Sequence, residues 1–187
     1  MQTHFTDAQR TAPAVQRSES AIRKCVHCGF CTATCPTYVL LGDERDSPRG
    51  RIALIQNMLE AGGTPDAATV RHVDRCLSCL ACTTTCPAGV DYAQLIDHGR
   101  AYIAEHYERP WHDRLMRWTL AAVLPHRDRF RAALALAPLG RLVQPLLART
   151  TAFKPLAAML ALAPRQLPKS EPAPATQHKR RVLMLRG

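Results

Sequence analysis

The sequence contains no apolar stretch long enough to cross a membrane. A spanning helix needs about 20 apolar residues, whereas the longest stretches here, around residues 132–140 and 155–164, reach about half that length and contain or adjoin proline. Residues 1–20 are polar and lack the apolar core of a secretory signal. We therefore expect a cytoplasmic protein that does not cross a membrane.

Signatures of catalysis are also absent. The sequence shows no Ser/His/Asp set, no glycine-rich phosphate-binding loop and no paired-carboxylate arrangement. A length of 187 residues allows one ordinary domain or two small ones, which excludes a large multidomain enzyme. We therefore expect no catalytic residues and no substrate site within this chain.

Cysteine is missing from most of the chain, because all eight cysteines lie between residues 25 and 86. Without a secretory signal the expected compartment is reducing, where cysteines serve more often as metal ligands or redox groups than in disulfides. The run Cys-x2-Cys-x2-Cys-x3-Cys-Pro occurs from Cys25 to Pro36 and again from Cys76 to Pro87, an internal repeat with an offset of 51 residues. This repeat is the strongest functional signal in the sequence.

The repeated spacing is typical of proteins that bind two 4Fe-4S clusters. Three thiolates at two-residue gaps can surround one face of a cluster, and in two-cluster proteins the fourth cysteine completes the other cluster. All irons then carry cysteine ligands, which indicates electron transfer instead of substrate chemistry. The predicted first cluster is held by Cys25, Cys28, Cys31 and Cys86, and the predicted second cluster by Cys76, Cys79, Cys82 and Cys35.

Two structural zinc sites are the competing interpretation of eight cysteines. Zinc sites usually join two Cys-x2-Cys pairs from either side of a longer loop, whereas here three ligands fall within seven residues, twice. The spacing therefore favours iron–sulfur clusters. Small residues around the ligands either allow close backbone approach to a cluster or simply fit tight turns, and His27 is either a tuning residue or an exposed turn residue.

Three stretches of this sequence resemble the iron–sulfur subunit of bacterial glycolate oxidase, over roughly residues 20–110. They are Cys25-Val-His-Cys-Gly-Phe-Cys-Thr-Ala-Thr-Cys-Pro, Ser47-Pro-Arg-Gly-Arg-Ile and Asp74-Arg-Cys-Leu-Ser-Cys-Leu-Ala-Cys. The resemblance implies a subunit that relays electrons from an FAD-containing, glycolate-oxidising partner toward the quinone pool. It also implies a mostly helical ferredoxin module. Iron–sulfur subunits of related lactate or glycerol-3-phosphate dehydrogenases share the cysteine runs and remain an alternative, as does a free-standing ferredoxin-like electron carrier.

The chain departs from this family in one respect. Members of the family continue into cysteine-rich domains with Cys-Cys-Gly motifs, and this sequence contains none. The run Val182-Leu-Met-Leu resembles the first strand of such a domain, so we expect a truncated reading frame or a fragment.

Charge is distributed unevenly along the chain. Residues 1–108 carry 10 Lys/Arg against 12 Asp/Glu, a net charge of −2, whereas residues 109–187 carry 15 against 3, a net charge of +12. The basic half fits docking onto an acidic subunit, or peripheral contact with the anionic inner face of the cytoplasmic membrane, and it equally fits a solvated helical face. With no recognised motif or aromatic platform beside the arginines, nucleic acid is not an expected partner.

The predicted fold class is mostly α, since no segment alternates at period two. Pro125, Pro138 and Pro145 are expected to cut the C-terminal half into short helices. Predicted helix starts lie at Asp46-Ser47-Pro48, Thr64-Pro65, Asp91 and Pro110. The expected domains are a flexible N-terminus (1–19), a helical 4Fe-4S ferredoxin domain (20–108), a basic helical extension (109–163), and a flexible linker with the stub of a cysteine-rich domain (164–187).

Overall fold

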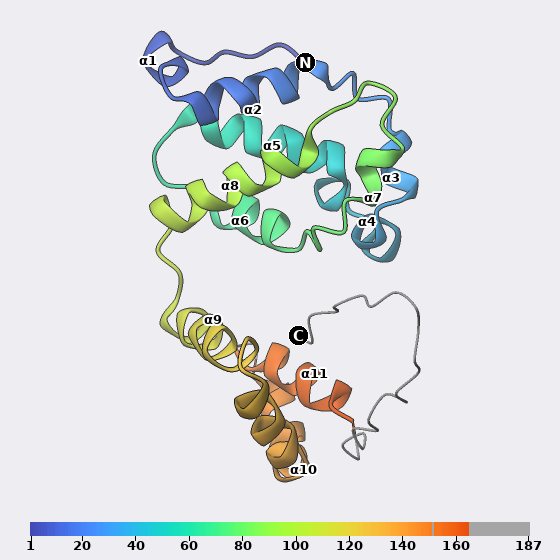
Figure 1. Ribbon diagram of the computed structural model, residues 1–187, viewed down its shortest axis with the longest axis vertical. Coiled ribbons are helices and arrows are strands. Elements are labelled where there is room, and N and C mark those ends of the chain that lie inside the picture. The colour runs from blue at the N-terminus through green and yellow to red at the C-terminus, as the bar shows by residue number, and fades with distance from the viewer. Residues whose placement is uncertain (151, 165–187) are drawn as a thin grey trace, which may run out of the picture. The chain divides into compact units, whose positions relative to one another are not determined.

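The computed structural model describes residues 1–150 and 152–164, and the chain divides into two compact units with the boundary between Glu108 and Arg109 (Figure 1). Within the described residues every regular element is helical and no strand occurs, which confirms the mostly α fold class. Among the same residues no helix is long and apolar enough to span a membrane. The predicted linker and the strand at Val182 lie outside the described residues.

Three longer helices form the frame of the first unit. They are α2 (Pro13–Lys24), α5 (Pro48–Ala61) and α8 (Tyr92–His106), and α8 contacts α2, α5 and the shorter α6 (Ala67–Asp74). The close approach of α8 to α5 depends on Gly99, because a Cβ at this position would lie 3.0 Å from Cγ1 of Ile55. The side chains that are fully buried between these helices include Ile22, Ile55, Val73, Leu95, Ile96 and Ile103.

Short helices gather at one end of this frame and carry the cysteine loops (Figure 1). They are α3 (Phe30–Ala33), α4 (Pro36–Leu41), the 3-10 helix η1 (Glu44–Asp46) and α7 (Ala81–Thr84). Helices α3 and α7 contact each other, and η1 runs directly into α5. The core helices therefore present both cysteine runs at the same end of the unit.

Two of the predicted helix starts are confirmed in detail. The Ser47 hydroxyl accepts a hydrogen bond from the Gly50 amide at 2.9 Å, and the Asp91 carboxylate accepts one from the Gln94 amide at 3.2 Å. Helix α6 begins later than Thr64-Pro65 predicts, because Asp66 caps it by accepting from the amides of Ala68 and Thr69.

The prediction of a flexible N-terminus over residues 1–19 is wrong. Helix α1 (Asp7–Arg10) carries a capping box, and α2 begins at Pro13. Phe5 is buried in the core, and the largely buried Glu19 carboxylate binds both Arg10, at 3.1 Å, and the Thr3 hydroxyl, at 2.8 Å. Hydrogen bonds from Arg10 and Thr3 hold the pKa of Glu19 below its ordinary value. A partly buried ion pair and an apolar anchor thus order a segment that is polar in sequence.

The second unit contains α9 (Trp111–Val123), α10 (Arg127–Arg149) and α11 (Lys154–Leu162). The expected break of α10 at Pro138 and Pro145 is wrong, because both prolines lie inside one helix of 23 residues. Each proline removes one helix hydrogen bond and its ring crowds the carbonyl four residues earlier, but the surrounding alanine, leucine and arginine residues favour helix and the helix continues. Helix α11 packs back against α10, where Gly140 faces Leu160 and Arg141 donates to the carbonyl groups of Leu160 and Ala163.

Candidate metal centre

The two cysteine loops share one backbone conformation. His27 and Gly29 in the first loop have positive φ angles of 55° and 88°, and their counterparts 51 residues later, Ser78 and Leu80, have 51° and 57°. Three of these four residues are not glycine, and such strained conformations concentrate at functional sites. Successive turns of this kind aim backbone amides at a common point and are suited to anionic groups. The repeat in sequence is therefore also a repeat in structure.

Threonine side chains stabilise the turns after each loop. The Thr32 and Thr83 hydroxyls donate to the carbonyl groups of Gly29 and Leu80, and equivalent threonines Thr34 and Thr85 meet at 3.1 Å between the two repeats. These hydroxyls bind backbone or each other, so their observed contacts support the turns.

The fourth cysteine of each run lines the cavity formed by the other run. The first cavity spans ≈ 450 Å³ of space between protein atoms and the second ≈ 300 Å³, and both volumes include space that is open to solvent. The cysteines around the first cavity are Cys25, Cys28, Cys31, Cys82 and Cys86. The cysteines around the second cavity are Cys35, Cys76, Cys79 and Cys82. Apart from Cys82, which lines both cavities, these are the two groups of the crossed pairing expected from the sequence.

A common wall separates the two cavities. Pro48, Cys82 and Tyr92 line both of them. The Tyr92 hydroxyl lies 3.6 Å from Sγ of Cys76, and burial raises the pKa of this phenol. The first turn of α5 and the start of α8 therefore hold the two cysteine groups next to each other.

The donor set fits iron–sulfur clusters. Each cavity is lined by four or more thiols, three of which come from one loop of seven residues. Burial raises the pKa of Cys31, and it raises that of Cys82 to about 12, so these thiols do not ionise readily without a compensating cation. Iron would supply that charge, and three ligands from one loop with a fourth from a distant run is the arrangement of two-cluster ferredoxins.

Basic groups anchor both loops through their backbone. Arg100 of α8 donates to the Cys76 carbonyl at 2.5 Å and to the Ser78 hydroxyl at 2.6 Å. In the first loop the N-terminal ammonium of Met1 donates to the Cys25 carbonyl at 2.9 Å, and Arg49 donates to the His27 carbonyl at 3.2 Å. Sequence reasoning missed these anchors, because only the fold brings them to the loops.

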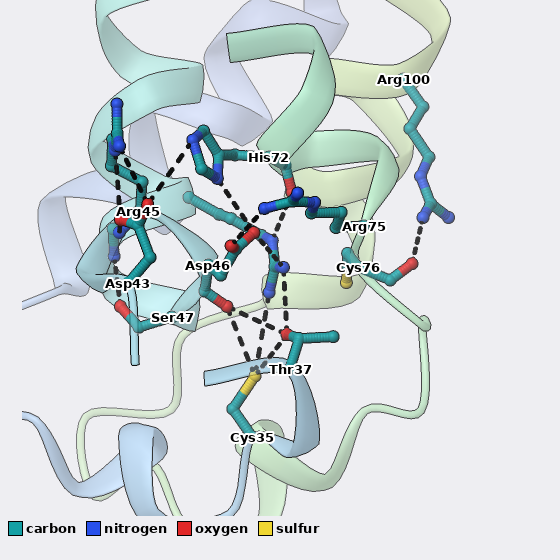
Figure 2. A network of polar contacts seen from close by, with 12 residues as sticks. Cys35, Thr37, Asp43, Arg45, Asp46, Ser47, His72, Arg75, Cys76 and Arg100 are labelled. Atoms are coloured by element: carbon teal, nitrogen blue, oxygen red, sulfur yellow. Dashed lines mark hydrogen bonds and ion pairs between the residues drawn. The ribbon is translucent and has the colours of Figure 1, made fainter. Parts of the chain in front are cut away.

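Cys35 lies beside a buried polar network that the sequence analysis also missed (Figure 2). Its Sγ atom is 3.2 Å from the Thr37 hydroxyl and 3.8 Å from Nη1 of Arg51. Burial alone would raise the pKa of Cys35, but hydrogen bonds from Thr37, the Tyr38 amide and Arg51 outweigh burial and lower it. The available signal was the Ser47-Pro-Arg-Gly-Arg stretch, whose second arginine is Arg51.

The same network contains three other residues of types that can bind metal ions. One potential ligand atom from each of Asp43, Asp46 and His72 lies within 4.8 Å of the other two. Both carboxylates already bind arginine: Asp43 pairs with Arg45 at 2.9 Å, and Asp46 pairs with Arg75 at 2.9 Å. A cation would have to compete with these guanidinium groups, so this group fits a metal ion poorly.

Comparisons with known proteins agree with the cysteine chemistry. Residues 21–90 match the family described as 4Fe-4S dicluster domain. The chain is 45% identical over all 187 residues to the glycolate oxidase iron-sulfur subunit of Escherichia coli strain K12 and covers 43% of that protein. It is also similar to the probable glycolate oxidase iron-sulfur subunit of Bacillus subtilis strain 168, with 39% identity over 120 residues. These residues are 63% of this chain and 27% of that relative.

The chain thus spans less than half the length of these two relatives. No solved structure matches it. The resemblance predicted from the cysteine motifs is confirmed: the chain carries a 4Fe-4S dicluster domain and is similar, along its whole length, to an iron-sulfur subunit of glycolate oxidase.

Proposed function

We propose that this chain is the electron-transfer part of a glycolate oxidase, with two 4Fe-4S clusters held by its eight cysteines. The observation that carries the proposal is the pair of adjacent cavities, each lined by three cysteines of one run and the fourth cysteine of the other. When bound, such clusters take up and release single electrons. Similarity to two iron-sulfur subunits of glycolate oxidase supports the same role.

The chain's own residues hold and enclose the clusters in this proposal. Cys25, Cys35 and Cys82 are buried, whereas Cys28 and Cys79 are exposed, one at each cavity. Each cluster would therefore have one edge near solvent, where a redox partner can approach. Tyr92 and Pro48, both buried, form part of the wall between the cavities.

Oxidation of the substrate is assigned to a partner. We propose that an FAD-containing subunit oxidises glycolate to glyoxylate and passes its electrons to this chain, which relays them toward the quinone pool. The names of both relatives specify glycolate oxidase. Lactate or glycerol-3-phosphate dehydrogenases with related iron–sulfur subunits are the alternative partners. A free-standing carrier is less well supported, because a diffusing carrier has no need of the basic second unit.

The second unit is proposed to contact the anionic inner face of the cytoplasmic membrane from the cytoplasmic side. Trp118, Leu139 and Leu142 are each more than 60% exposed, and nearby Arg129 and Arg131 are exposed as well. Apolar residues with flanking arginines are typical of helices that lie at a lipid surface. We expect the full chain to sediment with anionic vesicles and to be released by salt. Equal binding to neutral vesicles, or binding only to an acidic protein subunit, would contradict this membrane contact.

The proposed function is tested by reducing the chain with a candidate partner. Anaerobically prepared protein, mixed with the glycolate-oxidising flavoprotein and glycolate, should lose its broad visible absorbance as electrons arrive. Glycolate without the flavoprotein should leave the absorbance unchanged. Bleaching with lactate or glycerol 3-phosphate and their own flavoproteins, but not with glycolate, would assign the chain to a sister enzyme.

A further inference from the structure

Arg51 is an almost fully buried cation next to one of the proposed cluster ligands. It lies in α5 with 1% of its surface exposed. Its guanidinium donates to the His72 carbonyl at 2.7 Å, to the Thr37 hydroxyl at 3.0 Å and to Oδ1 of Asp46 at 3.3 Å. Nη1 of Arg51 donates to Sγ of Cys35 at 3.8 Å. Four hydrogen bonds from its five N–H groups are therefore directed to fixed partners, one of which is sulfur.

The network behind Cys35 is built around one buried carboxylate, that of Asp46. The Asp46 carboxylate is fully buried and binds both Arg51 and Arg75, the latter at 2.9 Å, together with Nδ1 of His72 at 2.9 Å (Figure 2). Arg51 itself lines the second cavity, so its guanidinium lies in the cavity wall beside Cys35.

The first cavity lacks this arrangement at the corresponding place. Cys86 is the counterpart of Cys35 in the repeat, and within the part of the chain that the structure describes no side chain donates a hydrogen bond to its sulfur. Arg49 lines the first cavity, but its guanidinium binds Glu44 and the His27 carbonyl. Each cavity is therefore lined by one arginine, but among the described residues only the arginine of the second cavity donates a hydrogen bond to a cysteine sulfur.

We propose that Arg51 raises the reduction potential of the second cluster, the one held by Cys35, Cys76, Cys79 and Cys82. The proposal rests on the function proposed above. An added electron makes a cluster more negative, so a buried positive charge and N–H donors to a ligating sulfur stabilise the reduced form more than the oxidised form. Arg51 does not touch substrate and acts through Cys35, so it is a positioning residue.

The test is an anaerobic redox titration of the loaded full chain, followed by EPR, with iron and sulfide content measured on each sample. In Arg51→Met the reduction potential of the second cluster should become more negative by at least about 59 mV. This shift corresponds to a tenfold change in the one-electron equilibrium constant. The potential of the first cluster should stay unchanged. Arg51→Lys, which keeps the charge, should recover part of the shift.

The matched control is Arg75→Met. Arg75 pairs with the same Asp46 carboxylate, but 42% of its side chain is exposed, and among the described residues it donates no hydrogen bond to sulfur. Its loss should move the second potential by much less than the loss of Arg51. An equal shift in both variants would show that general charge, and not the contact with Cys35, sets the potential, and would overturn the proposal.

If Arg51→Met does not fold, the same redox titration of Thr37→Val tests the proposal. The Thr37 hydroxyl lies between Sγ of Cys35 and Nη2 of Arg51, so its removal should shift the second potential in the same negative direction. Full iron content with wild-type potentials in the folded variants overturns the role of Arg51 and leaves the proposed function intact. A chain that binds no 4Fe-4S cluster overturns both.

Discussion

Replacing Cys35 by alanine should remove the cluster that is held mainly by the second cysteine run. Cys35 lies in the first run, but its side chain lines the second cavity with Cys76, Cys79 and Cys82. We expect about four of about eight iron atoms to be lost, because each 4Fe-4S cluster needs its fourth thiolate. The EPR signal that remains should belong to the cluster held by Cys25, Cys28 and Cys31.

The matched variant is Cys86→Ala, which should have the opposite outcome. Cys86 lines the first cavity, so its loss should remove the cluster of the first run and spare that of the second. The two variants should therefore retain different EPR signals with similar iron content. Loss of the local cluster in each case, with the distant one intact, would contradict crossed ligation.

Gly50→Ala should strongly destabilise the first unit. A Cβ at Gly50 would lie 2.0 Å from the Glu44 carbonyl oxygen and 3.0 Å from Cα of Arg45, both backbone atoms of η1. Alanine favours helix over glycine by up to about 1 kcal/mol, but this clash forces η1 away from α5. We expect a net loss of about 3 kcal/mol or more in the free energy of unfolding, measured by urea denaturation.

The same substitution should also lower iron content, since η1 and the first turn of α5 carry Asp46 and Arg51 beside Cys35. Asn57→Ala is the control, because Asn57 is exposed on the same helix and its replacement should change stability by less than about 0.5 kcal/mol. A Gly50→Ala protein as stable as the Asn57→Ala protein would show that η1 does not pack as the structure has it.

The parts of the site that sequence predicts are those encoded locally. The cysteine repeat identifies eight thiols, and Ser47 and Asp91 begin their helices as expected because a cap acts within three residues of itself. The family resemblance followed from the same short motifs.

The network behind Cys35 could not be predicted in this way. Asp46 and His72 are 26 residues apart and meet only because α6 packs against η1 and α5. The Ser47-Pro-Arg-Gly-Arg stretch includes Arg51, but this local pattern does not show that the arginine is almost completely buried. Contacts between distant segments depend on the assembled core, which local patterns do not specify.

Two local predictions failed for a related reason. Polar composition suggested a flexible N-terminus, but the buried Glu19 and Phe5 fix that segment through tertiary contacts. Prolines suggested broken helices, yet α10 continues through Pro138 and Pro145. In both cases the surrounding residues contribute more than the single feature from which the prediction was made.

The most direct test of the account is the iron and acid-labile sulfide content of anaerobically prepared chain. Two 4Fe-4S clusters predict about eight iron and about eight sulfide per chain, with the broad brown absorbance of such clusters. Stoichiometric zinc without sulfide would contradict the account, because the cysteines would then form structural zinc sites.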